Sequence, residues 1–411
     1  MKPITLALAV WLAVAAFPAS AAQPYTLQQL LDLAAATNKG AQATAAGVDA
    51  ARAGIATARA YPNPEVEFLT GRVSARQPGA VAGPTQTYSV TQRIDLPGQR
   101  RLRGEIAGKT LDAVSAGQRA YMSDLAARVK EAYYDALRRQ AEFEASEEDL
   151  RLTQQIYERA LVRVDAGDAP RYELIRAEAE LLNAQKNSQT AMLRVSRAKS
   201  VLRQQVGDRL PGNYALHGTL ARAPHIPDLA RLREVLAATN PELARLRDEV
   251  ERAELAVDYE RSLRLPSVAL RLAAEREPDA RNTRLGVVLS VPLWDRRQGP
   301  IDEAAAGVIR MRSLLEAREF ELQQGLDSAY QQFQIAAAQA EAFESGIVRQ
   351  AEAALRVAEA AYRFGERGII DYLDAQRVLR NARNELIAAQ YDLQLAAVEI
   401  ERLLANTPVG P

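Results

Sequence analysis

The sequence predicts a mainly α-helical protein with a small β part, built twice on one plan of helix, β-hairpin and long helix. Three observations support this prediction. A helical segment at 27–38 returns at 229–240, two long stretches are dominated by helix-forming residues, and four short segments alternate apolar and polar residues. A repeat that spans most of a chain indicates a duplicated architecture rather than unrelated domains.

The first residues predict export from the cytoplasm. Lys2 precedes the apolar run ITLALAVWLAVAAF, and Ala19 and Ala21 fit the small-residue cleavage pattern. This is the layout of a secretory signal peptide, which we assign to 1–21. No later run reaches the ~18 apolar residues that a membrane helix needs. Any part of the chain that crosses a membrane is therefore expected to do so with strands.

Two repeats follow, at 22–210 and 211–411. LQQLLDLAAATN (27–38) returns as LARLREVLAATN (229–240), an offset of 202. Further along the offset is 198, so that Gly167 matches Gly365, Glu173 matches Asp371 and Ala177 matches Ala375. The first copy is four residues longer in between, where its Gly/Pro-rich loop 75–86 lies. A length difference confined to a loop is typical of a true duplication.

Each repeat contains two segments with the period-two pattern of strands, which we assign to 64–72, 85–95, 266–275 and 282–293. In the last, Leu285, Val287 and Leu289 alternate with Gly286 and Val288. Two hairpins in an exported protein suit a membrane β-barrel. Four strands cannot close a barrel, and open strand edges are not tolerated in lipid. Several chains would have to share the barrel.

The long helices are expected from about Gln99 to Val164 and from about Gln298 to Phe364. About 65 residues at ~1.5 Å each form a rod of ~100 Å, which suits a tube or a scaffold rather than a compact globule. Bends follow at 165–171 and 365–370. After each bend, apolar positions recur at alternating spacings of three and four, with Ala between larger residues, as in a coiled-coil seam. The alternative to a tube is a periplasmic structural protein with long coiled coils and no barrel.

The composition excludes several functional classes. Lys plus Arg equals Asp plus Glu at 52 each, so no electrostatic footprint for nucleic acid exists. Cysteine is absent, and His217 and His225 lie in a Pro-rich linker without metal-ligand spacing. No acid accompanies a histidine, a phosphate-binding loop or a ligand set. We therefore expect no metal site, no cofactor and no enzymatic activity.

The quoted patterns resemble the TolC family of outer-membrane efflux ducts over essentially the whole mature chain. The resemblance is carried by the duplicated plan, YPNPEVEF before the first strand, RIDLPGQRRLR after the second, and a G-x9-A bend in both copies. YPNPE and DLPGQRR are most similar to the heavy-metal-efflux branch. The resemblance implies a homotrimer in the outer membrane, with a 12-stranded barrel that continues into an α-helical periplasmic tunnel. It would pass substrate, in this branch heavy-metal cations, from an inner-membrane pump of the resistance–nodulation–division (RND) type and a periplasmic adaptor.

The resemblance also assigns roles at the two bends, which would form the inner mouth of the tunnel. Glu173 takes an acidic gate position facing Tyr362, and Arg367 takes the position of the gate arginine, whose usual hydroxyl partner is replaced by Tyr172. Asp371 and Asp374 match an acidic ring around the lumen, and lie three residues apart on one helix face. An alternative is that acids in a first helical turn simply complement the helix dipole. The adaptor would dock on the bends themselves, at Gly167, Asp168, Gly365, Glu366 and Gly368.

Overall fold

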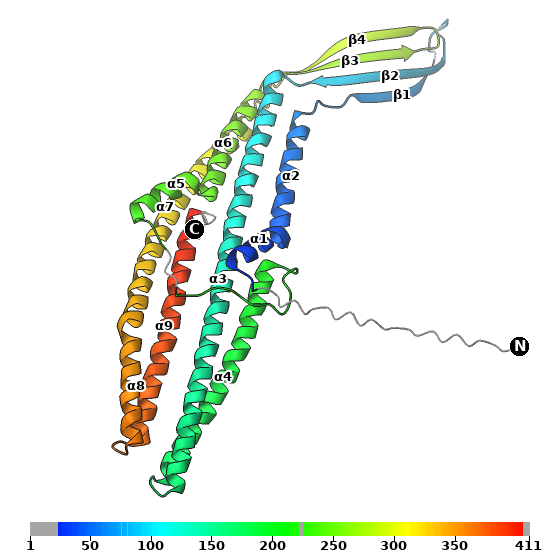
Figure 1. The fold of residues 1–411 in the computed structure, drawn as a ribbon. Coiled ribbons are helices and arrows are strands. Elements are labelled where there is room, and N and C mark those ends of the chain that lie inside the picture. The colour runs from blue at the N-terminus through cyan, green and yellow to red at the C-terminus, as the bar shows by residue number, and fades with distance from the viewer. Residues whose placement is uncertain (1–23, 75, 80, 222–224, 406–411) are drawn as a thin grey trace, which may run out of the picture.

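The computed structural model describes residues 24–74, 76–79, 81–221 and 225–405, and the predicted signal peptide lies outside them. The chain is elongated (Figure 1). A four-stranded sheet stands at one end, two helical hairpins end at the other, and shorter helices pack beside the long ones between these ends.

The predicted order of helix, hairpin and long helix occurs in both copies. The first copy comprises α1 (Leu27–Thr37), α2 (Lys39–Arg59), β1 (Glu65–Val73), β2 (Gly83–Ile94), α3 (Pro97–Asp165) and α4 (Arg171–Val206). The second comprises α5 (Leu229–Thr239), α6 (Pro241–Ser262), β3 (Ser267–Arg276), β4 (Arg281–Ser290), α7 (Gln298–Ala342), a π-helix (Phe343–Ile347), α8 (Val348–Arg363) and α9 (Ile369–Leu404). Strand ends lie within three residues of the predicted ones.

The second long helix differs from the expected continuous one, because the π-helix Phe343–Ile347 separates α7 from α8. Ser345 and Gly346 lie in this segment, and both are weaker helix formers than the Ala, Gln and Glu around them. A π-turn is a common way to interrupt an α-helix. The corresponding helix of the first copy, α3, runs without interruption.

The same Thr-Asn pair ends the first helix of each copy and fastens it to the last helix. Asn38 caps α2 by accepting from the amides of Gly40 and Ala41, and its side-chain nitrogen donates to the carbonyl of Gln205 at 3.0 Å. Asn240 caps α6 in the same way and donates to the carbonyl of Leu403 at 2.8 Å. Each Asn therefore satisfies groups at two helix ends, which would otherwise remain unpaired.

The strands form one antiparallel sheet in the order β1-β2-β3-β4. The register places apolar side chains together on one face: Val66, Phe68, Tyr88, Val90, Leu270, Leu272, Leu285 and Val287. All eight are exposed to solvent in the single chain. The opposite face carries Glu67, whose carboxylate accepts from Ser89 and from Arg271, both at 3.0 Å. The sheet is thus two-faced, and β1 and β4 are its open edges.

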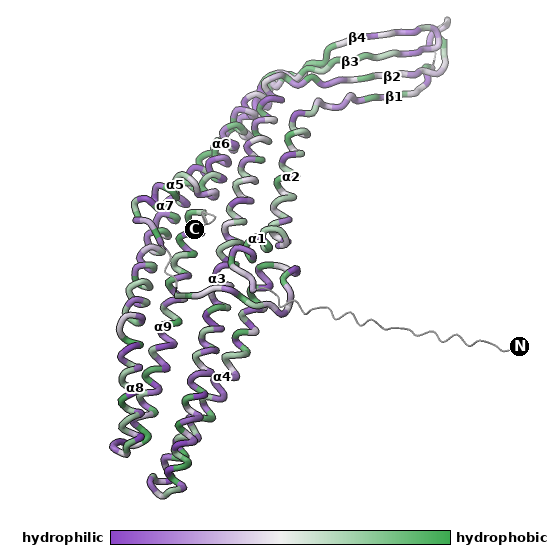
Figure 2. The backbone as a smooth tube through the Cα atoms, in the orientation of Figure 1, coloured by the Kyte–Doolittle hydropathy of each residue, from purple (hydrophilic) through white to green (hydrophobic). Residues whose placement is uncertain are grey.

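The helical core is divided into clusters along the rod. The largest lies where α1, α3 and α4 meet the segment after α4, and includes Leu30, Leu125, Leu202 and Tyr214. A second joins α5, α7 and the end of α9, and a third lies at the tips. Figure 2 shows apolar and polar residues mixed along every long helix. Among the described residues, no helix is both long and apolar enough to span a membrane.

Candidate functional site at the helical tips

Both bends end their helices with one and the same motif. Gly167 and Gly365 adopt positive φ, at 81° and 75°, a conformation that glycine enters without a Cβ penalty. The amide of Asp168 donates to the carbonyl of Arg163 at 2.8 Å, and the amide of Glu366 donates to that of Ala361 at 2.9 Å. These are Schellman caps, which satisfy carbonyls at a helix end. The predicted docking residues therefore sit on two compact loops of matching shape.

The first predicted gate pair meets in the structure. The Tyr362 hydroxyl donates to Oε2 of Glu173 at 3.4 Å, joining the end of α8 to the first turn of α4. Tyr362 is buried, and burial raises the pKa of its phenol, with the Glu173 charge adding to the effect. The phenol therefore stays protonated and able to donate. Gly368 lies beside this pair, since a Cβ on it would be 3.7 Å from Oε1 of Glu173.

Arg367 and the two aspartates form ion pairs with residues close in sequence. Nη1 of Arg367, in the loop before α9, lies 3.3 Å from Oδ2 of Asp371 in the first turn of α9. Asp374 pairs with Arg377 at 2.8 Å, and Arg377 also reaches Glu180 of α4 at 3.2 Å. The link from Arg367 to the first copy that the resemblance implied is not formed within one chain. Each aspartate also has an arginine neighbour, which lowers the negative charge that it presents.

Sequence patterns did not reveal three further residues at the tips. The guanidinium of Arg163 lies over the Tyr362 ring, 4.8 Å from its centroid, and donates to the Tyr362 carbonyl at 3.4 Å. Arg159 of α3 forms an ion pair with Glu359 of α8 at 2.8 Å. The only sequence signal was that both arginines lie within two turns of the bend. These contacts hold the hairpin formed by α3 and α4 (coil 1) against the hairpin formed by α8 and α9 (coil 2).

Buried tyrosines fill the space between the two coils. The rings of Tyr362 and Tyr372 lie 5.8 Å apart among Ile156, Ala177 and Ile369. The hydroxyl of Tyr372 is buried and has no partner in hydrogen-bond geometry among the described residues, but the guanidinium of Arg159 lies near enough to interact with it. Burial raises the pKa of this phenol, so it stays protonated. The tip is thus held by a few polar links over a small apolar cluster.

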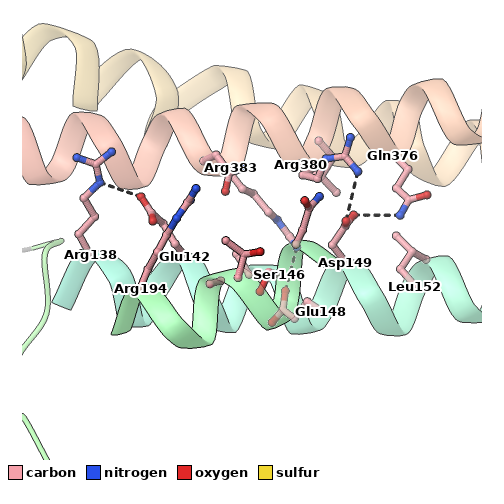
Figure 3. A pocket seen from close by; sticks show the side chains of 16 residues that line it. Arg138, Glu142, Ser146, Glu148, Asp149, Leu152, Arg194, Gln376, Arg380 and Arg383 are labelled. Atoms are coloured by element: carbon pink, nitrogen blue, oxygen red, sulfur yellow. Dashed lines mark hydrogen bonds and ion pairs between the residues drawn. The ribbon is translucent and has the colours of Figure 1, made fainter. Parts of the chain in front are cut away.

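Further from the tips, a polar groove with a volume of about 340 Å³ lies between coil 1 and coil 2 (Figure 3). On its floor the carboxylate of Asp149 in α3 accepts from Gln376 at 3.0 Å and from Arg380 at 3.3 Å, both in α9. Arg383 of α9 pairs with Glu148 at 2.9 Å. No group of three or more acidic, histidine or cysteine side chains that would hold a metal ion occurs among the described residues.

Comparison with known proteins agrees with this architecture. The chain is similar to the cobalt-zinc-cadmium resistance protein CzcC of Cupriavidus metallidurans, with 28% identity over 96% of this chain and 93% of that protein. It is 27% identical to the nickel and cobalt resistance protein CnrC of the same organism, over 80% and 78% of the two chains. The crystal structure of CusC matches its fold with a TM-score of 0.80 at 17% identity, covering 92% of this chain and 91% of CusC. The sequence pattern of the outer membrane efflux protein family covers 30–208 and 232–406, so the chain belongs to that family.

Proposed function

We propose that three copies of this chain form the exit duct of a tripartite efflux pump in the outer membrane, and that the exported substrate is a heavy-metal cation. The observation that carries the assembly is the two-faced sheet with open edges. Its apolar face is exposed in the single chain, and β1 and β4 have no outer partner. Three such sheets, joined β4 to β1, would close a 12-stranded barrel without unpaired edges.

The substrate proposal rests on two kinds of support. Similar proteins are named for resistance to cobalt, zinc, cadmium and nickel. Asp371 and Asp374 would place six carboxylates around the mouth of a trimer, and rings of Asp favour cations over anions. Selection among metals would then belong to the inner-membrane pump, because an open duct need not bind its cargo.

At the mouth, we assign the gate to Glu173, Tyr362, Arg367, Asp371 and Asp374. The Tyr362–Glu173 link closes coil 2 onto coil 1 within a chain. The two glycine-capped loops project beyond the helix ends, with every residue from 365 to 368 exposed. They offer backbone groups and the side chains of Asp168 and Glu366 to a periplasmic adaptor.

Cell fractionation separates the duct from a periplasmic scaffold. The duct is expected in the outer-membrane fraction, extracted only by detergent, as a trimer whose mobility on a gel changes on heating. A monomer in the periplasmic extract would support the scaffold instead. Deleting the gene and complementing it, with growth measured in graded zinc, cobalt and cadmium, tests the substrate class. An unchanged tolerance to all three metals would contradict heavy-metal export while leaving the duct intact.

A further inference from the structure

Four ion pairs join coil 1 to coil 2 within one chain, in the half of the coils nearer the tips. They are Arg159–Glu359 (2.8 Å), Glu180–Arg377 (3.2 Å), Asp149–Arg380 (3.3 Å) and Glu148–Arg383 (2.9 Å). Figure 3 shows the side chains of the last two pairs between α3 and α9. Ion pairs therefore recur along the contact between the two coils of a single chain, beside the apolar cluster at the tips.

A ring built from three chains contains a second kind of coil contact. Coil 1 touches coil 2 of its own chain, and coil 2 must then touch coil 1 of the next chain. Because the two coils are copies of each other with an offset of 198, they can occupy equivalent places in such a ring. Adding 198 to a coil 1 residue, and subtracting 198 from its coil 2 partner, then gives the positions that meet between chains.

The four ion pairs map onto positions without any charge. Arg159–Glu359 becomes Val357 and Leu161, Glu180–Arg377 becomes Val378 and Ala179, Asp149–Arg380 becomes Ile347 and Leu182, and Glu148–Arg383 becomes Gly346 and Gln185. In three of the four cases both mapped residues are apolar. The charged contact within a chain is thus replaced by an apolar contact at the equivalent place between chains.

The same residues are unusually exposed for apolar side chains. Val357 is 70% exposed, Leu182 61% and Val378 56%, although each lies on a long helix with a buried seam. Exposed apolar patches of this kind indicate an interface. Their agreement in register, pair by pair, favours a second copy of this chain as the occupant over lipid or an unrelated partner.

Two residues of opposite charge at the tips follow the same rule. Glu158 and Arg363 line one groove between α3 and α8 within a chain, without forming an ion pair there. Their mapped positions are Arg356 and Asp165, so both signs are reversed and the pair remains complementary. Arg356 and Asp165 are exposed and have no ion-pair partner among the described residues. Such a reversal is expected if the two positions meet, since like charges there would repel.

We propose that coil 2 of one chain binds coil 1 of the next through Val357 against Leu161, Val378 against Ala179 and Ile347 against Leu182, with Arg356 facing Asp165. This inference rests on the trimer of the proposed function and assigns its contacts. The chain-to-chain seam is apolar where the seam within a chain is ionic. Salt should therefore weaken the contact within a chain more than the contact between chains.

Cysteine cross-linking with a bifunctional methanethiosulfonate reagent tests the assignment, because the natural chain has no cysteine and the spacer joins positions whose backbones are too far apart for a direct disulfide. One variant carries Val357→Cys with Leu161→Cys, and a second carries Val378→Cys with Ala179→Cys. Treatment with this reagent in detergent or in membranes should produce covalent trimers on denaturing gels, which a reductant returns to monomers. Each single-cysteine variant should give on the order of tenfold less cross-linked species, because its thiols are not held together. The matched control, Arg159→Cys with Glu359→Cys, should be cross-linked by the same reagent within one chain and form no covalent oligomer.

The outcomes separate this inference from the proposed function. Light scattering reports whether each variant is still a trimer. If the trimer is present and the control pair is cross-linked within its chain, but neither test pair is cross-linked between chains, the assigned contacts are wrong and the proposed duct is unaffected. A single-cysteine variant that cross-links to itself would indicate a two-fold contact and refute the ring. Charge exchange gives a second measurement that does not depend on disulfides. Arg356→Asp should lower the temperature at which the trimer dissociates, and adding Asp165→Arg should restore it; a double variant no better than the single one would contradict the pairing.

Discussion

Replacing Tyr362 with Phe removes the hydrogen bond that ties coil 2 to Glu173 in the first turn of α4 and leaves the ring in place. The phenol oxygen lies 3.4 Å from Oε2 of Glu173, longer than most hydroxyl–carboxylate bonds. We therefore take the typical net value of a hydrogen bond, ~0.5–1.5 kcal/mol, rather than the larger value for a charged partner. The Glu173 carboxylate is partly exposed, so water can replace the lost donor and the desolvation cost is small.

A trimer multiplies this small value. If the mouth opens as a unit, three lost links remove ~1.5–4.5 kcal/mol from the closed state. Since ~1.4 kcal/mol corresponds to a factor of ten, the ratio of open to closed channels should rise on the order of 10- to 1,000-fold. A single chain that opens independently loses one link, so its ratio of open to closed states should rise only about 2- to 12-fold. The size of the effect therefore reports on concerted opening.

Single-channel recording in planar bilayers measures this ratio. Tyr362→Phe should increase the open probability or the mean conductance, and Glu173→Gln should act in the same direction but less strongly, because an amide oxygen still accepts. The matched control is Tyr372→Phe, which removes a neighbouring buried hydroxyl, near Arg159, and leaves the Tyr362–Glu173 link in place. It should leave the channel closed. If Tyr362→Phe and Tyr372→Phe behave alike, the Tyr362–Glu173 link does not hold the gate.

Three other predictions follow from the same geometry. Replacing Asp371 and Asp374 together with Asn should lower cation selectivity and block by multivalent cations, most clearly at low salt, where charges are least screened; unchanged reversal potentials would show that these acids only complement the helix dipole. Gly365→Ala should lower the free energy of unfolding by ~1–2 kcal/mol, because a φ of 75° is unfavourable for a residue with a Cβ. The control Gly54→Ala lies inside α2, where an added Cβ meets no other atom, and should be neutral or stabilising. Ala382→Leu places a large side chain in the buried seam of α9 and should cost ~1–3 kcal/mol; an unchanged melting temperature would argue against close packing there.

The sequence by itself determined the parts of the structure that depend on local pattern. Apolar periodicity predicted all four strands and the first long helix to within three residues at each end, because burial of one face has a fixed period in each kind of element. It did not predict the π-helix that divides the second long helix. The G-x9-A pattern located both bends, because a Schellman cap needs glycine at one position. The recurrence of these patterns, at an offset of 202 before the loop 75–86 and 198 after it, indicated the duplication.

Only the tertiary structure decided which side chains meet. Arg367 binds Asp371, Asp374 shares Arg377 with Glu180, and Arg163 covers Tyr362, although nothing in the order of the residues distinguishes these arginines from many others. Residues nearly 200 positions apart become neighbours through the rotation and height of one coil against the other. Those quantities are set by the packing of the whole core, so a charged side chain near a bend has several possible partners until the coils are in place.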